Sequence, residues 1–292
     1  MNLAIIGLGH WGKKLVIEFN KSHKIKYCHT KGNTQNISWL KKKFPKIKVV
    51  KQITEILDDD NIDAVIIATP IQSHKDLVKQ SLLQKKHVFV EKPLTESVYE
   101  SKNLITLAKK KKLCLFIGNI FLYHPVFLKL QKLLINEKIK SVSGTWLKMG
   151  TFHDNIISNL LYHDMCIIHE LIGKPKKIII ENSQNFITKS DIVDIKIIFS
   201  NKINCNLHIN RISNIKRKSI TIITEKNCYL WENDILFRFS EKNNQYEKLY
   251  ESQQTALENE CKIFSKDIST HTQKLDNAQK SLEIIRDLAS IL

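Results

Sequence analysis

The sequence lacks the features that mark membrane, disulfide-bonded and zinc-binding proteins. Its 292 residues contain no apolar run near the ~20 residues that a membrane-spanning helix needs. The six cysteines are scattered without a Cys-x-x-Cys pair, and the histidines show no His-x-x-x-His spacing. No charged leader precedes the first apolar segment. We therefore expect reduced thiols, no bound metal, no membrane partner and a cytoplasmic location.

Arginine is also scarce, although the chain carries a formal charge of +17. Only four of its 46 basic residues are arginines, and the lysines are spread along the whole chain. Proteins that read base sequence favour arginine forks, so we interpret the charge as a solvated lysine surface and expect no nucleic-acid partner. Such a surface still attracts phosphorylated or other anionic substrates.

Glycine is sparse too, yet three of the eight glycines fall within six residues. The segment Gly7-Leu8-Gly9-His10-Trp11-Gly12 follows an apolar strand at residues 3–6 and opens a helix. Backbone amides in a turn of this kind hold the pyrophosphate of a dinucleotide at the helix N-terminus. The segment predicts a Rossmann domain, with cofactor contacts from Gly7, Gly9, His10, Trp11 and Gly12. The alternative is a glycine turn that binds nothing.

The second strand, near residues 25–29, should end where the ribose is recognised. An NAD-preferring site usually has an acidic residue there, but this chain has Thr30-Lys31-Gly32-Asn33. A hydroxyl group and a lysine are better partners for a 2′-phosphate. The cofactor is therefore NAD or NADP, and Thr30 and Lys31 favour NADP.

Residues 63–95 contain the most informative segment of the chain. An apolar strand at residues 65–67 leads through Thr69-Pro70 into an amphipathic helix, and a second strand at residues 88–90 ends at Glu91-Lys92-Pro93. Parallel sheets bind ligands at the carboxyl ends of their strands, so Lys92 is a candidate catalytic residue rather than a surface lysine. We also expect that the Lys92-Pro93 bond is cis, which would direct the lysine inward.

These linked motifs resemble the glucose-fructose oxidoreductase, inositol dehydrogenase and rhizopine catabolism (Gfo/Idh/MocA) family. The matching positions are the three glycines of residues 7–12, Thr69-Pro70 with His74, His87-Val88 and Glu91-Lys92-Pro93. The spacing between the motifs also fits. The resemblance extends over the whole chain, although the C-terminal half matches more loosely.

The resemblance implies an NAD(P)-dependent dehydrogenase or reductase that acts on a CH-OH group of a sugar, cyclitol or nucleotide-sugar. It implies that Lys92 contacts both substrate and cofactor, and that Asn119 and Tyr123 face the substrate. Its remaining cofactor-binding positions are Ala68, Thr69, Pro70, His74 and Glu91. For His74, a purely local structural role is the alternative.

A second chemical segment, Asn159-Leu160-Leu161-Tyr162-His163-Asp164, begins a helix that runs to Gly173. Family members commonly place an aspartate four residues before the histidine, and here that position is Asn159. His163 is the candidate general base or acid, since imidazole has a reference pKa of about 6.5. Asp164 is a possible substitute carboxylate, and Asn159, His163 and Asp164 are candidate substrate contacts. The departure at Asn159 keeps one alternative open, an inactive nucleotide-binding regulatory protein of the same fold.

Beyond Gly173 the pattern changes to short β-branched or aromatic runs separated by polar turns, which predicts a mostly antiparallel sheet. The expected fold class is α/β, with a Rossmann domain at residues 1–119 and an α+β substrate-binding and oligomerisation domain at residues 120–292. Two helices should close the chain. In the family the open face of this sheet often makes the oligomer contact, so the resemblance implies a homo-oligomer.

Overall fold

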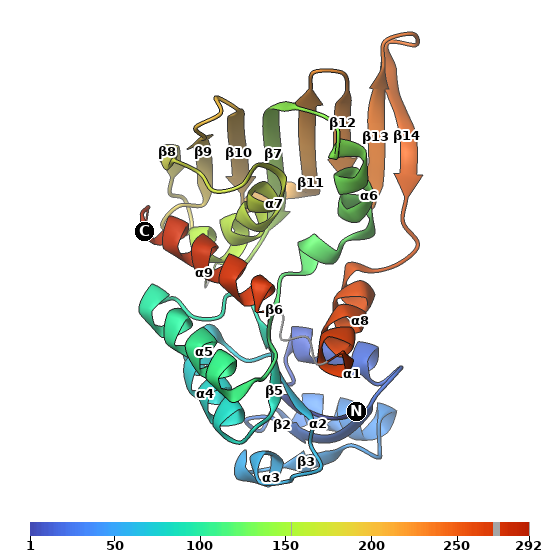
Figure 1. Cartoon of the computed structure of the whole chain (residues 1–292), viewed down its shortest axis with the longest axis vertical. Coiled ribbons are helices and arrows are strands. Elements are labelled where there is room, and N and C mark those ends of the chain that lie inside the picture. The colour runs from blue at the N-terminus through green and yellow to red at the C-terminus, as the bar shows by residue number, and fades with distance from the viewer. Residues whose placement is uncertain (153, 271–274, 292) are drawn as a thin grey trace. The chain divides into compact units, whose positions relative to one another are not determined.

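The computed structural model describes residues 1–152, 154–270 and 275–291 and divides into two compact units (Figure 1). The first unit contains Met1–Asn119 and Leu257–Leu282, and the second contains Ile120–Ala256 and Glu283–Leu292. The predicted second domain, residues 120–292, includes α8 (Ala256–Ser269), whereas the structure groups nearly all of this helix with the first unit.

The first unit is built on a parallel sheet of six strands in the order β3-β2-β1-β4-β5-β6. These are β1 (Asn2–Ile6), β2 (Lys24–His29), β3 (Lys48–Val50), β4 (Ala64–Ile67), β5 (His87–Glu91) and β6 (Leu115–Gly118). The central strands β1, β4 and β5 are short and apolar because helices cover both faces of the sheet. The strand order reverses between β1 and β4, which is the point where sheets of this topology bind dinucleotides.

The helices of this unit are α1 (His10–Phe19), α2 (Thr34–Lys43), α3 (Thr54–Leu57), α4 (His74–Leu83), α5 (Val98–Lys111) and α8 (Ala256–Ser269). Figure 1 shows α4 and α5 on one side of the strands and α1 and α8 on the other. The core beneath α1 and α8 is aromatic. Phe264 of α8 lies 5.5 Å from Phe89, 5.6 Å from Phe116 and 5.9 Å from Phe19, measured between ring centroids.

The second unit is built on an eight-stranded sheet in the order β14-β13-β12-β11-β7-β10-β9-β8. The strands are β7 (Ile139–Met149), β8 (Lys177–Gln184), β9 (Ile192–Ile198), β10 (Asn204–Asn210), β11 (Ile212–Thr224), β12 (Cys228–Glu232), β13 (Ile235–Ser240) and β14 (Gln245–Glu251). β7 and β10 are parallel, and the other neighbouring strands are antiparallel. Figure 1 shows α6 (Pro125–Leu134) and α7 (Tyr162–Ile172) against one face of this sheet. The last helix, α9 (Asp276–Ala289), contains the point at which the chain passes from the first unit to the second.

The predicted fold class is therefore confirmed, with a Rossmann sheet followed by a mostly antiparallel sheet. Two strands, β7 and β14, were missed. β7 carries Ser, Gly, Thr and Lys between its apolar residues, and β14 is a polar edge strand.

Candidate active site

The glycine turn between β1 and α1 has two glycines that the backbone itself requires. Gly7 has a φ of +100°, and a Cβ atom there would lie 2.4 Å from the carbonyl oxygen of Ala68. A Cβ atom at Gly12 would lie 2.1 Å from the carbonyl oxygen of Gly7. Gly9 differs, because it is exposed and a Cβ atom there would meet nothing within 4 Å. The space beside Gly9, at the N-terminus of α1, fits the pyrophosphate of a dinucleotide.

This difference between the glycines gives a first prediction. Gly9→Ala should weaken dinucleotide binding about tenfold, which corresponds to about 1.4 kcal/mol, and leave the unfolding free energy unchanged. Gly12→Ala is the matched comparison, because its methyl group meets backbone and should cost about 1–3 kcal/mol of stability. Calorimetric titration and denaturant unfolding measure the two quantities. Unchanged affinity in a folded Gly9→Ala protein would contradict the placement of the phosphates.

The other cofactor candidates of the N-terminal segment lie around the same edge of the sheet. Thr30 is half-buried and Lys31 is exposed directly after β2, while His10 and Trp11 are exposed in the first turn of α1. The Lys14 ammonium lies 4.6 Å from the centroid of the Trp11 ring. These positions leave polar side chains accessible at the carboxyl ends of β1 and β2.

His74 connects the two turns that carry the remaining motifs of the first unit. It is 1% exposed, and its two ring nitrogens each lie 2.9 Å from a carbonyl oxygen, one of Thr69 and one of Pro93. Burial lowers the pKa of His74, although both hydrogen bonds oppose the shift. These contacts support the local structural role of His74. The imidazole holds the Thr69-Pro70 turn, next to Ala68, against the turn that follows Lys92.

Glu91 and Lys92 end β5. Lys92 is partly exposed, and the Lys92-Pro93 peptide bond is cis, as expected. Burial raises the pKa of Glu91 to about 7, although the positive charge of Lys92 opposes this shift. The structure thus places an ammonium group at the carboxyl end of a central parallel strand. Asn119 is buried directly after β6, and Tyr123 is half-buried in the 3₁₀ turn that opens the second unit.

In the second unit, His163 lies in the first turn of α7, in contact with two aromatic rings. Its ring centroid is 5.1 Å from that of Phe121 and 5.6 Å from that of Trp146. Asn159 belongs to the π-helical turn before α7, and its amide nitrogen donates to Asp154 Oδ2 at 2.8 Å. A carboxylate therefore orients the asparagine at the position where the family commonly has an aspartate.

Asp164 is engaged by a residue that we did not predict. Its carboxylate accepts a hydrogen bond from Lys218 of β11, and both side chains are largely buried. The Lys218 ammonium lies over the rings of Trp146 and Phe121, at 3.6 and 4.6 Å from their centroids. Burial raises the pKa of Asp164 and lowers that of Lys218, and their mutual attraction opposes both shifts. Asp164 therefore has a cationic partner of its own beside the rings that flank His163.

Lys218 could have been found from the strand pattern. Lys218, Ile220 and Ile222 are two residues apart along β11 and therefore share one face of the strand. Ile220 and Ile222 are 2% and 0% exposed, so this is the buried face. A lysine on a buried strand face needs a partner or a function. Sequence alone does not show that this partner is Asp164.

A second unpredicted residue, Arg211, holds the segment before α7. Arg211 and Asp191 are 2% and 0% exposed, and Arg211 Nε donates to Asp191 Oδ1 at 3.0 Å. Arg211 Nη1 also donates to the carbonyl oxygens of Thr151 and Asp154, at 3.1 and 2.7 Å. Since Asp154 accepts from Asn159, the buried ion pair supports the backbone that positions Asn159.

Arg211→Met should lower the unfolding free energy by about 3–5 kcal/mol, because it leaves the buried Asp191 carboxylate without its cation. Arg217→Met is the matched control. Arg217 also pairs with a carboxylate, that of Glu232, but 48% of its side chain is exposed, so its loss should cost about 1 kcal/mol or less. Denaturant unfolding compares the two variants. Equal small losses would mean that the Arg211 network does not stabilise the second unit.

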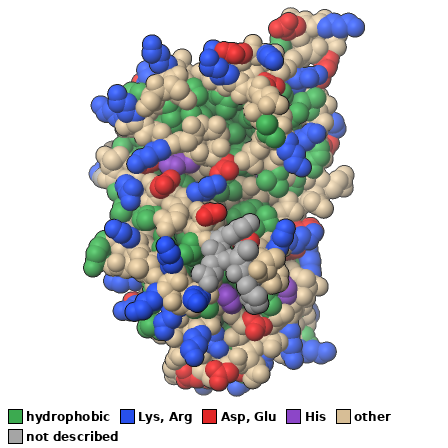
Figure 2. Space-filling view, in the orientation of Figure 1, with side chains coloured by type: hydrophobic (Ala, Val, Ile, Leu, Met, Phe, Trp, Pro, Cys, Tyr) green, Lys and Arg blue, Asp and Glu red, His purple; other side chains and the backbone are tan. Residues whose placement is uncertain are grey.

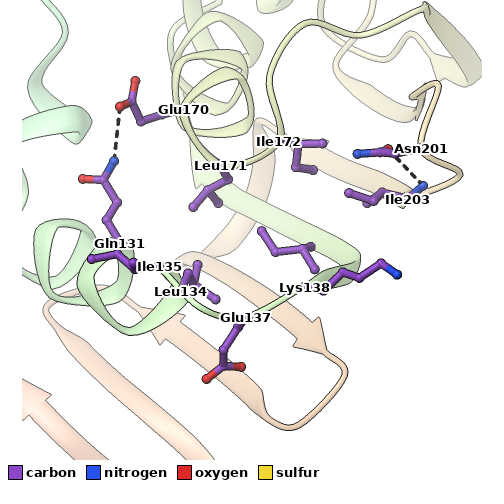
Figure 3. A pocket seen from close by; sticks show the side chains of 11 residues that line it. Gln131, Leu134, Ile135, Glu137, Lys138, Glu170, Leu171, Ile172, Asn201 and Ile203 are labelled. Atoms are coloured by element: carbon purple, nitrogen blue, oxygen red, sulfur yellow. Dashed lines mark hydrogen bonds between the residues drawn. The ribbon is translucent and has the colours of Figure 1, made fainter.

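A cavity of about 490 Å³ lies elsewhere in the second unit (Figure 3). Leu134, Leu171, Ile172 and Ile203 line it, and Gln131 Nε2 donates to Glu170 Oε1 at 3.3 Å. This cavity is at the C-terminal end of α7, while His163 is in the first turn, ~13 Å away at the rise of an α-helix. It is therefore separate from the candidate residues around His163.

Within residues 1–152, 154–270 and 275–291, no group of three or more His, Cys, Asp or Glu side chains is arranged to hold a metal ion. In the same part of the chain, no helix combines the length and apolar character of a membrane span.

On the face that Figure 2 shows, lysine and arginine side chains are scattered among acidic and neutral ones, which fits a solvated basic surface.

A protein-family model matches residues 1–119. The matching model is that of the Gfo/Idh/MocA family, described as an oxidoreductase family with an NAD-binding Rossmann fold. Myo-inositol 2-dehydrogenase of Thermotoga maritima is 29% identical over 140 residues, which cover 48% of this chain and 42% of that enzyme. The NAD(+)-dependent scyllo-inositol 2-dehydrogenase of Bacillus subtilis is 38% identical over 73 residues, which cover 25% of this chain and 21% of that enzyme. The chain thus spans less than half the length of these curated relatives.

The likeness to solved structures is longer. UDP-N-acetylglucosamine 3-dehydrogenase from Acidithiobacillus ferrooxidans matches 100% of this chain and 96% of its own, with a TM-score of 0.90 and 19% sequence identity. At this identity the likeness shows the fold, and it extends through both units. Residues 1–119 thus match the Gfo/Idh/MocA family of oxidoreductases, and the remaining chain continues the fold of the solved structure.

Proposed function

We propose that this protein is an NAD(P)-dependent oxidoreductase that transfers a hydride between nicotinamide and a CH-OH carbon of a sugar, cyclitol or nucleotide-sugar. The observation that carries the proposal is Lys92, an ammonium group at the carboxyl end of β5 in a Rossmann unit. The glycine turn of the same unit has open space beside Gly9 and fits a dinucleotide. The bound nicotinamide supplies the hydride acceptor or donor.

The proposed reaction uses two chemical groups of the chain, those of Lys92 and His163. Lys92 donates a hydrogen bond to the substrate oxygen and stabilises negative charge that develops there. His163 accepts the hydroxyl proton when the alcohol is oxidised and returns it when the ketone is reduced. Phe121 and Trp146 hold the imidazole, and Asn159, oriented by Asp154, lies one helical turn before it. Asn119, Tyr123 and Asp164 remain proposed contacts on the substrate side.

The formal charge of +17 supports an anionic substrate, such as a nucleotide-activated sugar. Thr30 and Lys31 at the end of β2 support NADP as the preferred cofactor, because neither is an acid that would accept from a ribose hydroxyl. Both preferences are measured in one experiment. NADP and NAD are each tested with a panel of inositols, free sugars and nucleotide-sugars, and the absorbance change of the nicotinamide is followed.

A second candidate function is a nucleotide-binding regulatory protein without turnover. Asn159 is the observation that favours it, because an asparagine can hydrogen-bond an imidazole but cannot take up its proton. The same experiment separates the two functions. Hydride transfer with any member of the panel supports the enzyme, whereas tight dinucleotide binding without turnover on every candidate supports the regulator.

A further inference from the structure

Two carboxyl groups lie next to the aromatic core of the first unit, and the proposed reaction does not use them. The first is Glu91. Across β5 and β6, Phe89 pairs with Phe116 and Glu91 pairs with Gly118. Residues two apart on a strand project from the same face, so Glu91 follows the phenylalanine layer. A Cβ atom at Gly118 would lie 3.3 Å from the Glu91 carboxyl carbon, so the glycine leaves room for that carboxyl.

The second carboxyl group, Glu260, comes from α8. Phe264 of this helix packs on Phe89 and Phe116, and Glu260 precedes it by one helical turn on the same face. Glu260 is 1% exposed, and neither of its carboxyl oxygens has a hydrogen-bond partner among the residues that the structure describes. A carboxylate in this position would be buried without compensation. Burial, together with the nearby Glu91, raises the pKa of Glu260 well above its usual value.

The other charged groups around this pair are few. Lys92 follows Glu91 and favours its ionised form. On α1, the carboxylate of Glu18 is 2.8 Å from the Lys21 ammonium, so these two charges largely offset each other. Burial raises the pKa of the neighbouring Cys261 thiol, which therefore stays neutral. Glu91 is thus a titratable group between one cation, Lys92, and one neutral acid, Glu260.

We infer that Glu91, beside the neutral acid Glu260, binds a proton in the unliganded protein and releases it to solvent when oxidised nicotinamide dinucleotide binds. The inference rests on the proposed function, since it needs the dinucleotide at the carboxyl end of β5. The oxidised nicotinamide ring carries a positive charge, which favours the Glu91 carboxylate. The reduced ring is neutral and leaves the proton in place. The protein therefore binds the oxidised form more tightly as the pH rises.

The size of this effect follows from the pKa of Glu91, which is about 7. The group is about half protonated at neutral pH, so binding of the oxidised dinucleotide should release about half a proton. Its affinity should rise about threefold per pH unit near neutrality, while the affinity for the reduced form stays nearly constant. Calorimetric titration in two buffers that differ in ionisation enthalpy measures the proton count directly, without any turnover.

Three variants test the assignment of the proton. Glu91→Gln should abolish the release. Glu260→Gln should keep it, because the amide stands in for a neutral acid, and Glu258→Gln on the same helix is a control that should also keep it. Zero release by the wild type, equal release with both redox forms, or unchanged release by Glu91→Gln would overturn the inference. No dinucleotide binding at all would instead overturn the proposed function.

The neutral state of Glu260 is tested by stability. A carboxyl group whose pKa is raised by folding stabilises the protein at acidic pH, and this contribution is lost as the pH rises through the folded pKa. Glu260→Gln should therefore unfold at a higher denaturant concentration than the wild type at neutral and alkaline pH. The difference should disappear below about pH 4. No difference at any pH would overturn the assignment of Glu260 as a buried acid without a partner.

Discussion

Lys92→Met should lower kcat by about 10²–10³-fold while the dissociation constant of the dinucleotide changes only a few-fold. The ammonium group at the carboxyl end of β5 is proposed to stabilise charge on the substrate oxygen in the transition state, and methionine keeps the side-chain length without the charge. Stopped-flow absorbance of the nicotinamide, with calorimetric titration of the cofactor, separates the two quantities. Lys79→Met, at an exposed position on α4, is the matched control and should behave as the wild type.

The pattern of the kinetic change distinguishes the role of Lys92 from simple binding. A higher KM with an unchanged kcat would mean that the lysine binds substrate and transition state equally well. That result would contradict the proposed role. Lys92→Arg is a second probe, because guanidinium keeps the charge but presents it as a planar fork. We expect this variant to recover only part of the lost rate.

His163→Ala should lower kcat by about 10²–10⁴-fold in the direction of alcohol oxidation, because no other group is proposed to accept the hydroxyl proton. Added imidazole should restore part of the activity of this variant and leave the wild type unaffected. The Phe121 and Trp146 rings, which contact the imidazole, would line the space that the added imidazole enters. Steady-state kinetics with and without imidazole measure the effect.

His208→Ala is the control for this variant. His208 lies on β10 between Leu207 and Ile209, whose side chains are buried. Its side chain therefore projects from the face of the sheet opposite to theirs. Its Nδ1 atom is 2.7 Å from Asp194 Oδ1. Full activity of His163→Ala, or rescue of both variants by imidazole, would show that His163 is not the proton acceptor. A wild type that binds dinucleotide but never turns over would favour the regulatory alternative.

Local patterns were sufficient to predict the strands of the first unit. The β-branched runs of β1, β4 and β5 are continuous because the sheet is buried on both faces, and the glycine turn and Lys92 follow strand ends directly. Such signals lie within a few residues of each other. They therefore identify an element and its ligand-facing end without knowledge of what packs against it.

The features that sequence analysis missed depend on pairs that are distant along the chain. Lys218 pairs with Asp164, and Arg211 binds the backbone of Thr151 and Asp154, across 54 to 60 residues. The strand pattern singles out Lys218, but neither segment shows which residue is its partner. Their partners become evident only when β11 lies beside α7, or the connection between β10 and β11 lies beside the segment before α7.

The same limit applies to α8. The spacing of its apolar residues predicted a helix, but a row of apolar residues on one helix face does not show which sheet that face packs against. Phe264 decides the question, because it completes a cluster with Phe19, Phe89 and Phe116 in the first unit. The predicted linear boundary thus placed the helix in one domain, whereas its aromatic side chain packs in the other unit.

α8 follows the strands of the second unit in the sequence but packs on the sheet of the first unit, and this order has a consequence for biosynthesis. While the ribosome is still translating the second unit, the Rossmann sheet has its strands but lacks the helix that covers Phe89 and Phe116. A nascent chain at that stage would expose aromatic surface, which is a target for chaperones and a risk for aggregation. The first unit can therefore be completed only after the second unit's strands and residues 257–282 have been synthesised.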